Sequence, residues 1–391
     1  MSSPQSPRTP GLQTRAIHGR QRPDSATGAV NTPIYASSTF VQSSPGVNTG
    51  WEYARSGNPT RAAFEAALAE LEGGAAGFAF ASGLAAQAAV LELLDHGAHV
   101  IASDDLYGGS WRLFHRVRER SAGLTITHVD ASDAAAIEAA ITPQTRLIWV
   151  ETPGNPLLRI ADLAAIGEIG KRRGLITVAD NTFASPVVQR PLEFGFDIVV
   201  HSVTKYVSGH SDIIGGAAIV RDAPDLVERL KFLQNATGGV LDAFSSFLAH
   251  RGLRTLPLRI ARHVTNAQTV AEYLGSHKKV AKVNYPGLRS HPQHNLAAKQ
   301  MNSGGGMVSF FVNGSPEQTI RVLERFHYFA LAESLGGVES LVSHPWTMSH
   351  ASIPEPLRRA AGITPQLVRL SVGIEDADDL IGDLEHALQA A

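Results

Sequence analysis

The chain has 391 residues, which is long enough for two domains that each bury a substantial core. Its 34 basic and 36 acidic side chains give a net charge of −2, which argues against a nucleic-acid or anionic-membrane surface and favours a small substrate. It has no cysteine, which excludes disulfides, thiolate metal sites and a cysteine nucleophile. The polar, proline-rich start and the short apolar runs predict a cytoplasmic protein with no signal peptide and no membrane span.

Residues 1 to about 56 show little helical periodicity and contain several prolines, so we expect an extended arm. Irregular segments of this length are uncommon inside compact domains, which favours an arm that wraps over a second subunit. The arm ends near Tyr53 and Arg55, and Thr60 is the predicted N-cap of a helix over 61–72.

Short apolar strands and helical segments alternate in the next part of the chain, to about residue 205. This alternation predicts an α/β fold with a mostly parallel sheet that helices cover on both faces. Past residue 256 the pattern changes to a long helix and mixed segments, typical of a smaller α+β domain. We expect strands from residue 77 and at 100–101, 147–150, 175–181, 198–200, 306–312 and 367–372, and helices at 85–94, from about 110, and at 162–173, 259–274, 317–325 and 378–388.

Side chains suited to chemistry follow several of these predicted strands. In open α/β sheets ligands bind at the carboxyl ends of the strands, so these side chains are expected to share one site. The turn at Gly83 and Leu84 leads from a strand into a helix, and the free amides of a helix start attract anions. The other strand-end residues are Tyr107, Asn155, Asp180, Ser202, Thr204 and Lys205.

Together these residues supply what a pyridoxal phosphate site requires. Such a site needs a lysine for the Schiff base, an acid for the pyridine nitrogen, a phosphate cradle and an aromatic face against the ring. Lys205 offers the amine, Asp180 the acid and Tyr107 the aromatic ring. The candidates for the phosphate are Gly83, Leu84, Ser202 and Thr204.

Two other interpretations use parts of the same sequence. Ser202 and Lys205 match the S-x-x-K pattern of acyl-transferring serine enzymes, but neither an S-D-N nor a K-T-G element follows. A noncatalytic, metal-binding module would use four histidines, whose spacing is looser than that of ordinary ligand sets. These histidines are His291, His294, His344 and His350.

Seven motifs spread over nearly the whole chain resemble those of the Cys/Met-metabolism family of pyridoxal phosphate enzymes, especially cystathionine γ-lyases and γ-synthases. They lie at 53–60, 80–84, 105–109, 151–156, 178–183, 197–216 and 331–337. The resemblance implies an aspartate-aminotransferase-like (fold type I) fold, with a cofactor-binding domain over 57–256 and a C-terminal domain over 257–391. It also implies a homo-oligomer, a dimer of dimers, in which the arm over 1–56 reaches the neighbouring subunit's site.

The resemblance also implies a role for each site residue. Lys205 would form the Schiff base with pyridoxal phosphate and act as the catalytic base, and Tyr107 would stack on the ring and take part in catalysis. Asp180 would face the pyridine nitrogen and Asn155 the phenolic oxygen. Tyr53 and Arg55 of the neighbouring subunit would join Gly83, Leu84, Ser202 and Thr204 at the phosphate. The implied substrate-binding residues are Arg369, at the α-carboxylate, with Asn155, Ser334, Glu333, Arg112 and Ser349.

The implied activity is cystathionine γ-lyase, which releases cysteine, 2-oxobutyrate and ammonia from cystathionine, with hydrogen sulfide release from cysteine as a side activity. Glu333 resembles an acid of family members that act at the γ-carbon, where it could hold the substrate's distal ammonium or merely cap a turn. The main alternative is a cystathionine γ-synthase, which joins cysteine to an acylated homoserine. A cystathionine β-lyase and a methionine γ-lyase rank below these two.

Overall fold

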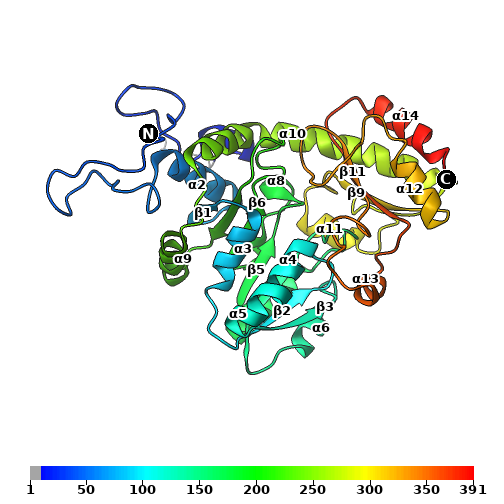
Figure 1. Ribbon diagram of the computed structural model, residues 1–391, viewed down its shortest axis with the longest axis horizontal. Helices are drawn as coiled ribbons and strands as arrows, with labels where there is room; N and C mark the ends of the chain where they lie inside the picture. Colours follow the sequence, from blue (N-terminus) through cyan, green and yellow to red (C-terminus); the bar gives the residue numbers. More distant parts are fainter. Residues whose placement is uncertain (1–9) are drawn as a thin grey trace, which may run out of the picture.

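The computed structural model describes residues 10–391, and the proline-rich first nine residues of the predicted arm lie outside the described part. A seven-stranded sheet has the order β1-β7-β6-β5-β4-β2-β3 (Figure 1). Strands β2 to β6 pair in parallel, and β7 runs antiparallel to both β6 and β1. The predicted mostly parallel sheet is therefore confirmed. Its strands are β1 Ala76–Phe80, β2 His99–Ser103, β3 Thr125–Val129, β4 Thr145–Glu151, β5 Ile176–Asp180, β6 Ile198–Ser202 and β7 Gly216–Val220.

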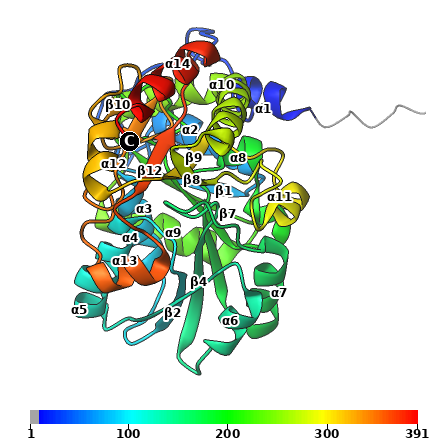
Figure 2. The same cartoon turned by 90° about the vertical axis from the view of Figure 1, so that its right-hand side faces the viewer.

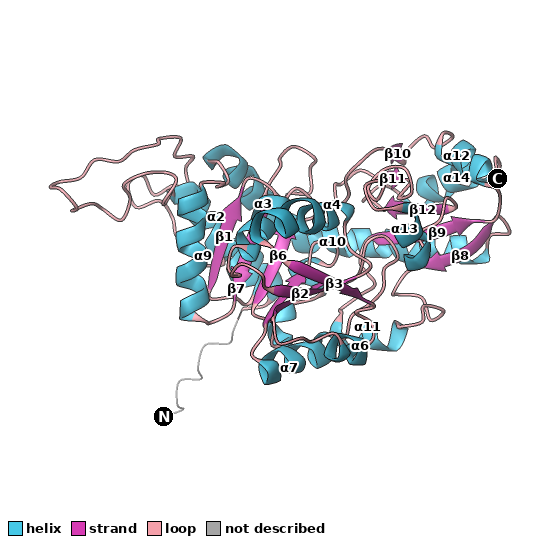
Figure 3. Ribbon diagram, turned by 60° about the horizontal axis from the view of Figure 1, so that its bottom comes forward, coloured by secondary structure: helices cyan, strands magenta, loops and turns pink. Residues whose placement is uncertain are grey.

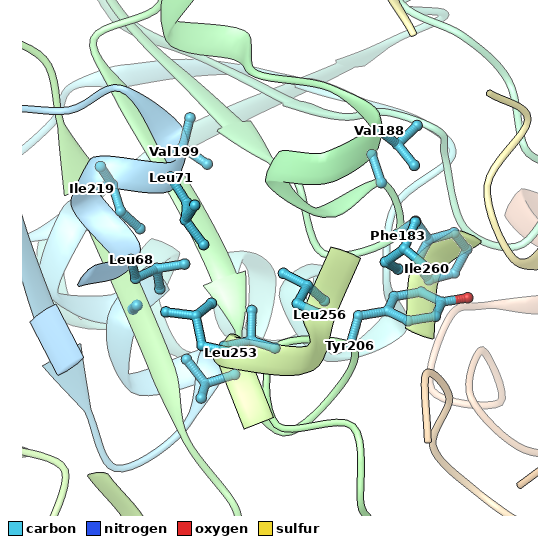
Figure 4. Packing of buried hydrophobic residues seen from close by; sticks show 14 of the residues in the cluster. Leu68, Leu71, Phe183, Val188, Val199, Tyr206, Ile219, Leu253, Leu256 and Ile260 are labelled. Atoms are coloured by element: carbon cyan, nitrogen blue, oxygen red, sulfur yellow. The ribbon is translucent and has the colours of Figure 1, made fainter. Parts of the chain in front are cut away.

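Helices cover both faces of this sheet, as the alternating pattern predicts. Figure 4 shows one face, where Leu68 and Leu71 meet the strand residues Val199 and Ile219. That face carries α2 Pro59–Glu72, α6 Ala134–Ala139, α7 Leu163–Arg173, α8 Ser185–Val188, η2 Pro191–Phe194 and part of α10 Ala243–Ser276. The other face carries α3 Gly83–Leu91, α4 Gly108–Arg112, η1 Leu113–Arg118, α5 Glu119–Ala122 and α9 Pro224–Thr237.

The 34-residue helix α10 joins the two halves of the molecule (Figures 1 and 2). Leu253 and Leu256 in its first half pack in the core beneath the large sheet, and Val270 and Leu274 in its second half pack in the core of the C-terminal part. The predicted division after residue 256 falls inside α10, just before Pro257. Among the described residues, no helix is both long and apolar enough to cross a membrane.

The C-terminal part contains a second, five-stranded sheet in the order β10-β11-β12-β9-β8. Its pairs are antiparallel except β10 with β11. The strands are β8 Val280–Asn284, β9 Met307–Val312, β10 Ala330–Leu331, β11 Leu341–Ser343 and β12 Leu367–Ser371. The helices are α11 His294–Gln300, α12 Pro316–Leu323, α13 Glu355–Ala361 and α14 Ala377–Leu388.

The described part of the arm projects from the body in long loops (Figures 1 and 3). It contains one short helix, α1 Leu12–His18, which the weak periodicity did not predict. Thr60 was also the wrong N-cap for α2, because the Asn58 side chain accepts the amides of Thr60 and Arg61. The Thr60 hydroxyl instead ties the arm to the helix, donating to the Pro33 carbonyl at 2.7 Å.

Candidate active site

A cavity of about 280 Å³ opens where the carboxyl ends of β4, β5 and β6 meet residues of the C-terminal part. Twelve residues that the sequence singles out line it together, drawn from segments far apart in the chain. They are Gly83, Leu84, Tyr107, Asn155, Asp180, Ser202, Thr204, Lys205, Glu333, Ser334, Ser349 and Arg369. The sequence analysis assigned no role to the other lining residues, which are Ser82, Gln87, Glu151, Thr182, Phe183, Ile214 and Leu335.

The Lys205 amine lies in this cavity, three residues past the end of β6. Its Nζ donates to the Ser334 hydroxyl at 2.7 Å. Burial, followed by the charge of Arg369, lowers the pKa of Lys205 from its usual 10.5 to about 8, although the charge of Glu333 opposes this shift. The amine is therefore closer to neutral at physiological pH than an exposed lysine, as a proton acceptor requires.

Ser334 lies in a backbone conformation that non-glycine residues rarely adopt, with φ of 106°. Strain of this kind persists where the surroundings hold it in place, and it is common at active sites. Here it places the Ser334 hydroxyl on Lys205 and the Ser334 carbonyl on Arg369, whose Nη2 donates to it at 3.1 Å. One residue thus connects the two basic groups of the site.

Arg369 projects from β12 and is 3 % exposed. Its Nη1 donates to Asn155 Oδ1 at 2.9 Å, while its buried Nε has no hydrogen-bond partner among the described residues. The chain between Thr152 and Arg159 is fixed in turn by the buried carboxylate of Asp105, which accepts the amides of Leu157 and Arg159. A guanidinium held in this way can bind a carboxylate with two parallel hydrogen bonds.

Asp180 ends β5 with its carboxylate buried at the cavity wall. It accepts Gln87 Nε2 at 3.2 Å and the Thr182 amide at 3.1 Å. Burial raises the pKa of Asp180, and the Thr182 hydrogen bonds, the His201 charge and Gln87 oppose this rise. The site therefore holds an acid that a buried cation would stabilise in its charged form.

Glu151 is a second buried acid, to which the sequence analysis gave no role. It lies opposite Asp180 in the pairing of β4 with β5, and its Oε2 accepts the Tyr107 amide at 2.8 Å. Burial first, and then the neighbouring charge of Asp180, raise the pKa of Glu151 well above its usual range. Its position at a strand end next to Asp180 was the signal that could have identified it.

The start of α3 forms a confined turn against β6 and β7. The Ser82 side chain caps the helix by accepting the Ala85 amide at 3.0 Å. A Cβ on Gly83 would lie 3.1 Å from Ser202, and a Cβ on Gly216 would lie 2.1 Å from the Ser82 carbonyl oxygen. Glycine is needed at Gly216 for this close approach, which brings the helix start beside Ser202, where Gly83 and Leu84 line the cavity.

Three predicted site residues do not line the cavity of their own chain. Arg55 lies over the Tyr53 ring at 5.1 Å and donates to Asn235 Oδ1 at 3.2 Å, beside α9. Arg112 is exposed on α4, where its nearest side-chain partner is the Ser352 hydroxyl at 3.5 Å.

The four histidines considered as metal ligands all bond to backbone carbonyls. The acceptors are Leu158 for His291, Pro286 for His294, Pro365 for His344 and Asn155 for His350. Within residues 10–391 no group of three or more histidine or acidic side chains could hold a metal ion.

The fold and the site define the class of protein. A mostly parallel sheet with a buried lysine after one strand, an acid at the end of its neighbour and a helix start beside both is the arrangement of fold type I pyridoxal phosphate enzymes. A family described as "Cys/Met metabolism PLP-dependent enzyme" matches residues 13–389, and the chain belongs to this family. Pyridoxal phosphate is therefore its cofactor.

Several similar proteins have names that refer to cystathionine. A cystathionine beta-lyase of Coxiella burnetii is 57% identical over 377 residues, which cover 96% of this chain and 97% of that protein. A cystathionine gamma-synthase of Mycobacterium bovis is 53% identical over 380 residues, 97% of each chain. The crystal structure of cystathionine gamma-lyase from Lactobacillus plantarum complexed with L-serine has a TM-score of 0.94 and 47% identity, covering 97% of this chain and 99% of that one.

Replacing Lys205 with methionine is expected to stabilise the cofactor-free protein at pH 7. Between pH 8 and 10.5 the unfolded chain binds more protons at this residue than the folded chain, so stability rises with pH. At pH 7 the folded protein carries the full cost of the buried ammonium, about 3 kcal/mol at 1.36 kcal/mol per pH unit. Methionine removes this cost. Because the cost shrinks as the folded protein's amine loses its proton above pH 8, the stability gain should fall to about half by pH 9.5.

Urea unfolding of the cofactor-free protein at both pH values measures this gain. The control is Lys171→Met, which changes an exposed lysine and should change stability by less than about 0.5 kcal/mol. A Lys205→Met gain that is the same at pH 7 and pH 9.5 would contradict the burial of the charged amine.

Proposed function

We propose that this chain is a cystathionine γ-lyase, which breaks the bond between the γ-carbon and sulfur of cystathionine and, with one molecule of water, yields cysteine, 2-oxobutyrate and ammonia. The observation that carries the proposal is that Arg369 and Glu333, of opposite charge, line one cavity. Arg369 is buried and Glu333 is exposed, and the charge of Glu333 acts on both Arg369 and Lys205. A basic inner end and an acidic outer end suit a substrate that has an amino-acid group at each end.

The residues of the cavity fit pyridoxal phosphate. In this proposal Lys205 binds the aldehyde, Asp180 the ring nitrogen and Asn155 the phenolic oxygen. The amides of Gly83 and Leu84, with the hydroxyls of Ser202 and Thr204, hold the phosphate at the start of α3. When bound, pyridoxal phosphate supplies an electron sink for the carbon that loses its proton.

The remaining chemistry consists of proton transfer and substrate positioning. Arg369 and Asn155 hold the α-carboxylate, which turns the α-hydrogen toward Lys205. The substrate's amino group would replace Lys205 at the aldehyde, which frees the lysine amine. The amine would then remove the α-proton and move protons at the β- and γ-carbons, so that the sulfur leaves as a thiol. Ser334 orients the amine, and Glu333 and Ser349 line the part of the cavity assigned to the side chain.

Tyr107 is proposed to cover the ring and to assist catalysis. Its backbone is fixed by Glu151, and its ring lies so close to Gly109 that a Cβ there would be 2.2 Å from Tyr107 Cε1. Arg112, on the same helix as Gly109, is proposed to contact the distal part of the substrate.

The arm is proposed to complete the site of a neighbouring subunit. Tyr53 and Arg55 do not line the cavity of their own chain, and the arm that carries them projects from the body. Exposed apolar side chains along it, such as Val30 at 77 % and Val41 at 89 %, fit a surface that another chain covers. In this proposal the enzyme is a cytoplasmic dimer of dimers in which each phosphate also meets Tyr53 and Arg55 of a neighbour.

Two sister activities are second candidates, because similar proteins carry their names. The beta-lyase of Coxiella burnetii is 57% identical and the gamma-synthase of Mycobacterium bovis 53% identical. A β-lyase would break the other carbon–sulfur bond of cystathionine and, with one molecule of water, release homocysteine, pyruvate and ammonia. A γ-synthase would join cysteine to an acylated homoserine.

Product analysis of the holoenzyme separates these activities. With cystathionine alone we expect 2-oxobutyrate and cysteine in equal amounts. With acylated homoserine and cysteine we expect cystathionine to form more slowly than the enzyme breaks it down. Lys205→Ala should lower product formation at least 1,000-fold, as expected for loss of a proton-transferring group. Pyruvate as the main oxo acid would identify a β-lyase, and faster cystathionine formation a γ-synthase.

Replacing Glu333 with glutamine tests whether its charge holds the distal ammonium of cystathionine. We expect the KM for cystathionine to rise about tenfold, because a hydrogen bond to a charged group contributes about 1.5–3 kcal/mol. Cysteine, the substrate of the hydrogen sulfide-releasing side activity, has no distal ammonium, so its KM should change less than twofold. Glu324→Gln, at an exposed acid outside the cavity, is the matched control. Equal effects of Glu333→Gln on both substrates would contradict the role of Glu333.

A further inference from the structure

A buried hydrogen bond between a histidine and a glutamate lies beneath the sheet, behind the cavity. His201 of β6 and Glu72, the last residue of α2, approach to 2.5 Å between Nε2 and Oε1. Their side chains are 1 % and 0 % exposed. Hydrophobic side chains fill the rest of the core on this face, including Leu68, Leu71 and Val199 (Figure 4).

The pair is joined to the strand end that carries Asp180. The side-chain amide of Asn181, the next residue, donates to Glu72 Oε1 at 2.9 Å and to the Gln189 carbonyl at 2.9 Å. The Asn181 backbone amide donates to the Val200 carbonyl, one residue before His201. Gln189 extends the network to the Thr152 carbonyl at 3.0 Å, in the segment that leads to Asn155.

His201 and Asp180 lie on opposite faces of the sheet at neighbouring positions. Asp180 pairs with Val200 in the register of β5 with β6, and side chains alternate along a strand. The Asp180 carboxylate therefore faces α3, where Gln87 meets it, and the His201 ring faces α2. The charge of His201 on β6 opposes the rise in the pKa of Asp180 that burial causes, and Asp180 in turn raises the pKa of Glu151 on β4.

If His201 and Glu72 are both charged, their burial lowers the stability of the fold unless the charges stabilise another group. Burying an ion pair costs several kcal/mol of desolvation per ion, and apolar replacements are often neutral or stabilising. The second carboxylate oxygen of Glu72 is buried and has no hydrogen-bond partner in the part of the chain that the structure describes, which adds to this cost. A positive charge fixed next to Asp180 offers a use, because preorganised charges stabilise a buried carboxylate.

We propose that His201 is a positioning residue whose imidazolium, held by Glu72, keeps Asp180 ionised so that the ring nitrogen of the cofactor stays protonated. The inference rests on the assignment of Asp180 to that nitrogen, proposed above. Glu72 supplies the counter-charge, and Asn181 and Gln189 fix its orientation.

A neutron crystal structure of the deuterium-exchanged holoenzyme at pH 8 tests the charges directly. We expect deuterium on both ring nitrogens of His201, none on Glu72, and deuterium on the cofactor ring nitrogen facing Asp180. Deuterium on only one His201 nitrogen, or on Glu72, would overturn the inference. A ring nitrogen that does not face Asp180 would instead overturn the cofactor assignment, so the two failures are distinguishable.

Variants test the consequence in solution. In Glu72→Gln and His201→Gln holoenzymes carrying ¹⁵N-labelled cofactor, the pH at which the ring nitrogen loses its proton should fall by about one unit. Gln189→Met breaks the same network without removing a charge, so it should lower the melting temperature and leave this pH unchanged. An unchanged pH in the charge variants, or an equal shift in Gln189→Met, would show a purely structural role. If the charge variants do not fold, the neutron structure decides.

Discussion

A lysine amine buried beside an arginine is the arrangement on which the rest of this structure depends. Burial and the charge of Arg369 favour the neutral form of Lys205, and the strained Ser334 holds both groups at hydrogen-bonding distance. Neither sheet could create this environment alone, because Lys205 follows β6 of the large sheet and Arg369 lies in β12 of the small one. The long helix α10, packed into both cores, helps to hold the two sheets together.

The parallel sheet contributes charge of the opposite sign. Its strand ends place Glu151 and Asp180 side by side, and burial raises the pKa of both. Two adjacent buried carboxyls favour having one neutral and one charged member, and they bind a cation more readily than a neutral group. The site thus presents an amine whose pKa is lowered and an acid in need of a positive partner, which suits a cofactor that reacts with the first and is protonated at the second.

Much of this could be predicted from the sequence, and the exceptions have physical reasons. Lys205 and Asp180 follow apolar strands, and the sheet brings strand ends together whatever the details of packing. The prediction that Arg369 and Ser334 belong to the site came from the family resemblance, because no local sequence pattern shows where a distant domain packs. The Glu72–His201 pair joins residues 129 positions apart, so only the folded chain reveals it. The Thr60 cap was wrong for a local reason, since Asn58 before a proline caps the helix better.

The central claim is that Lys205 carries the cofactor. Borohydride reduction of the holoenzyme followed by protease digestion and mass spectrometry measures this directly, because reduction makes the link between amine and cofactor permanent. The account predicts that the mass of the reduced cofactor is found on the peptide containing Lys205 and on no other, in a yield close to the bound cofactor. A fully loaded protein with the label on another lysine, or with no label, would contradict it.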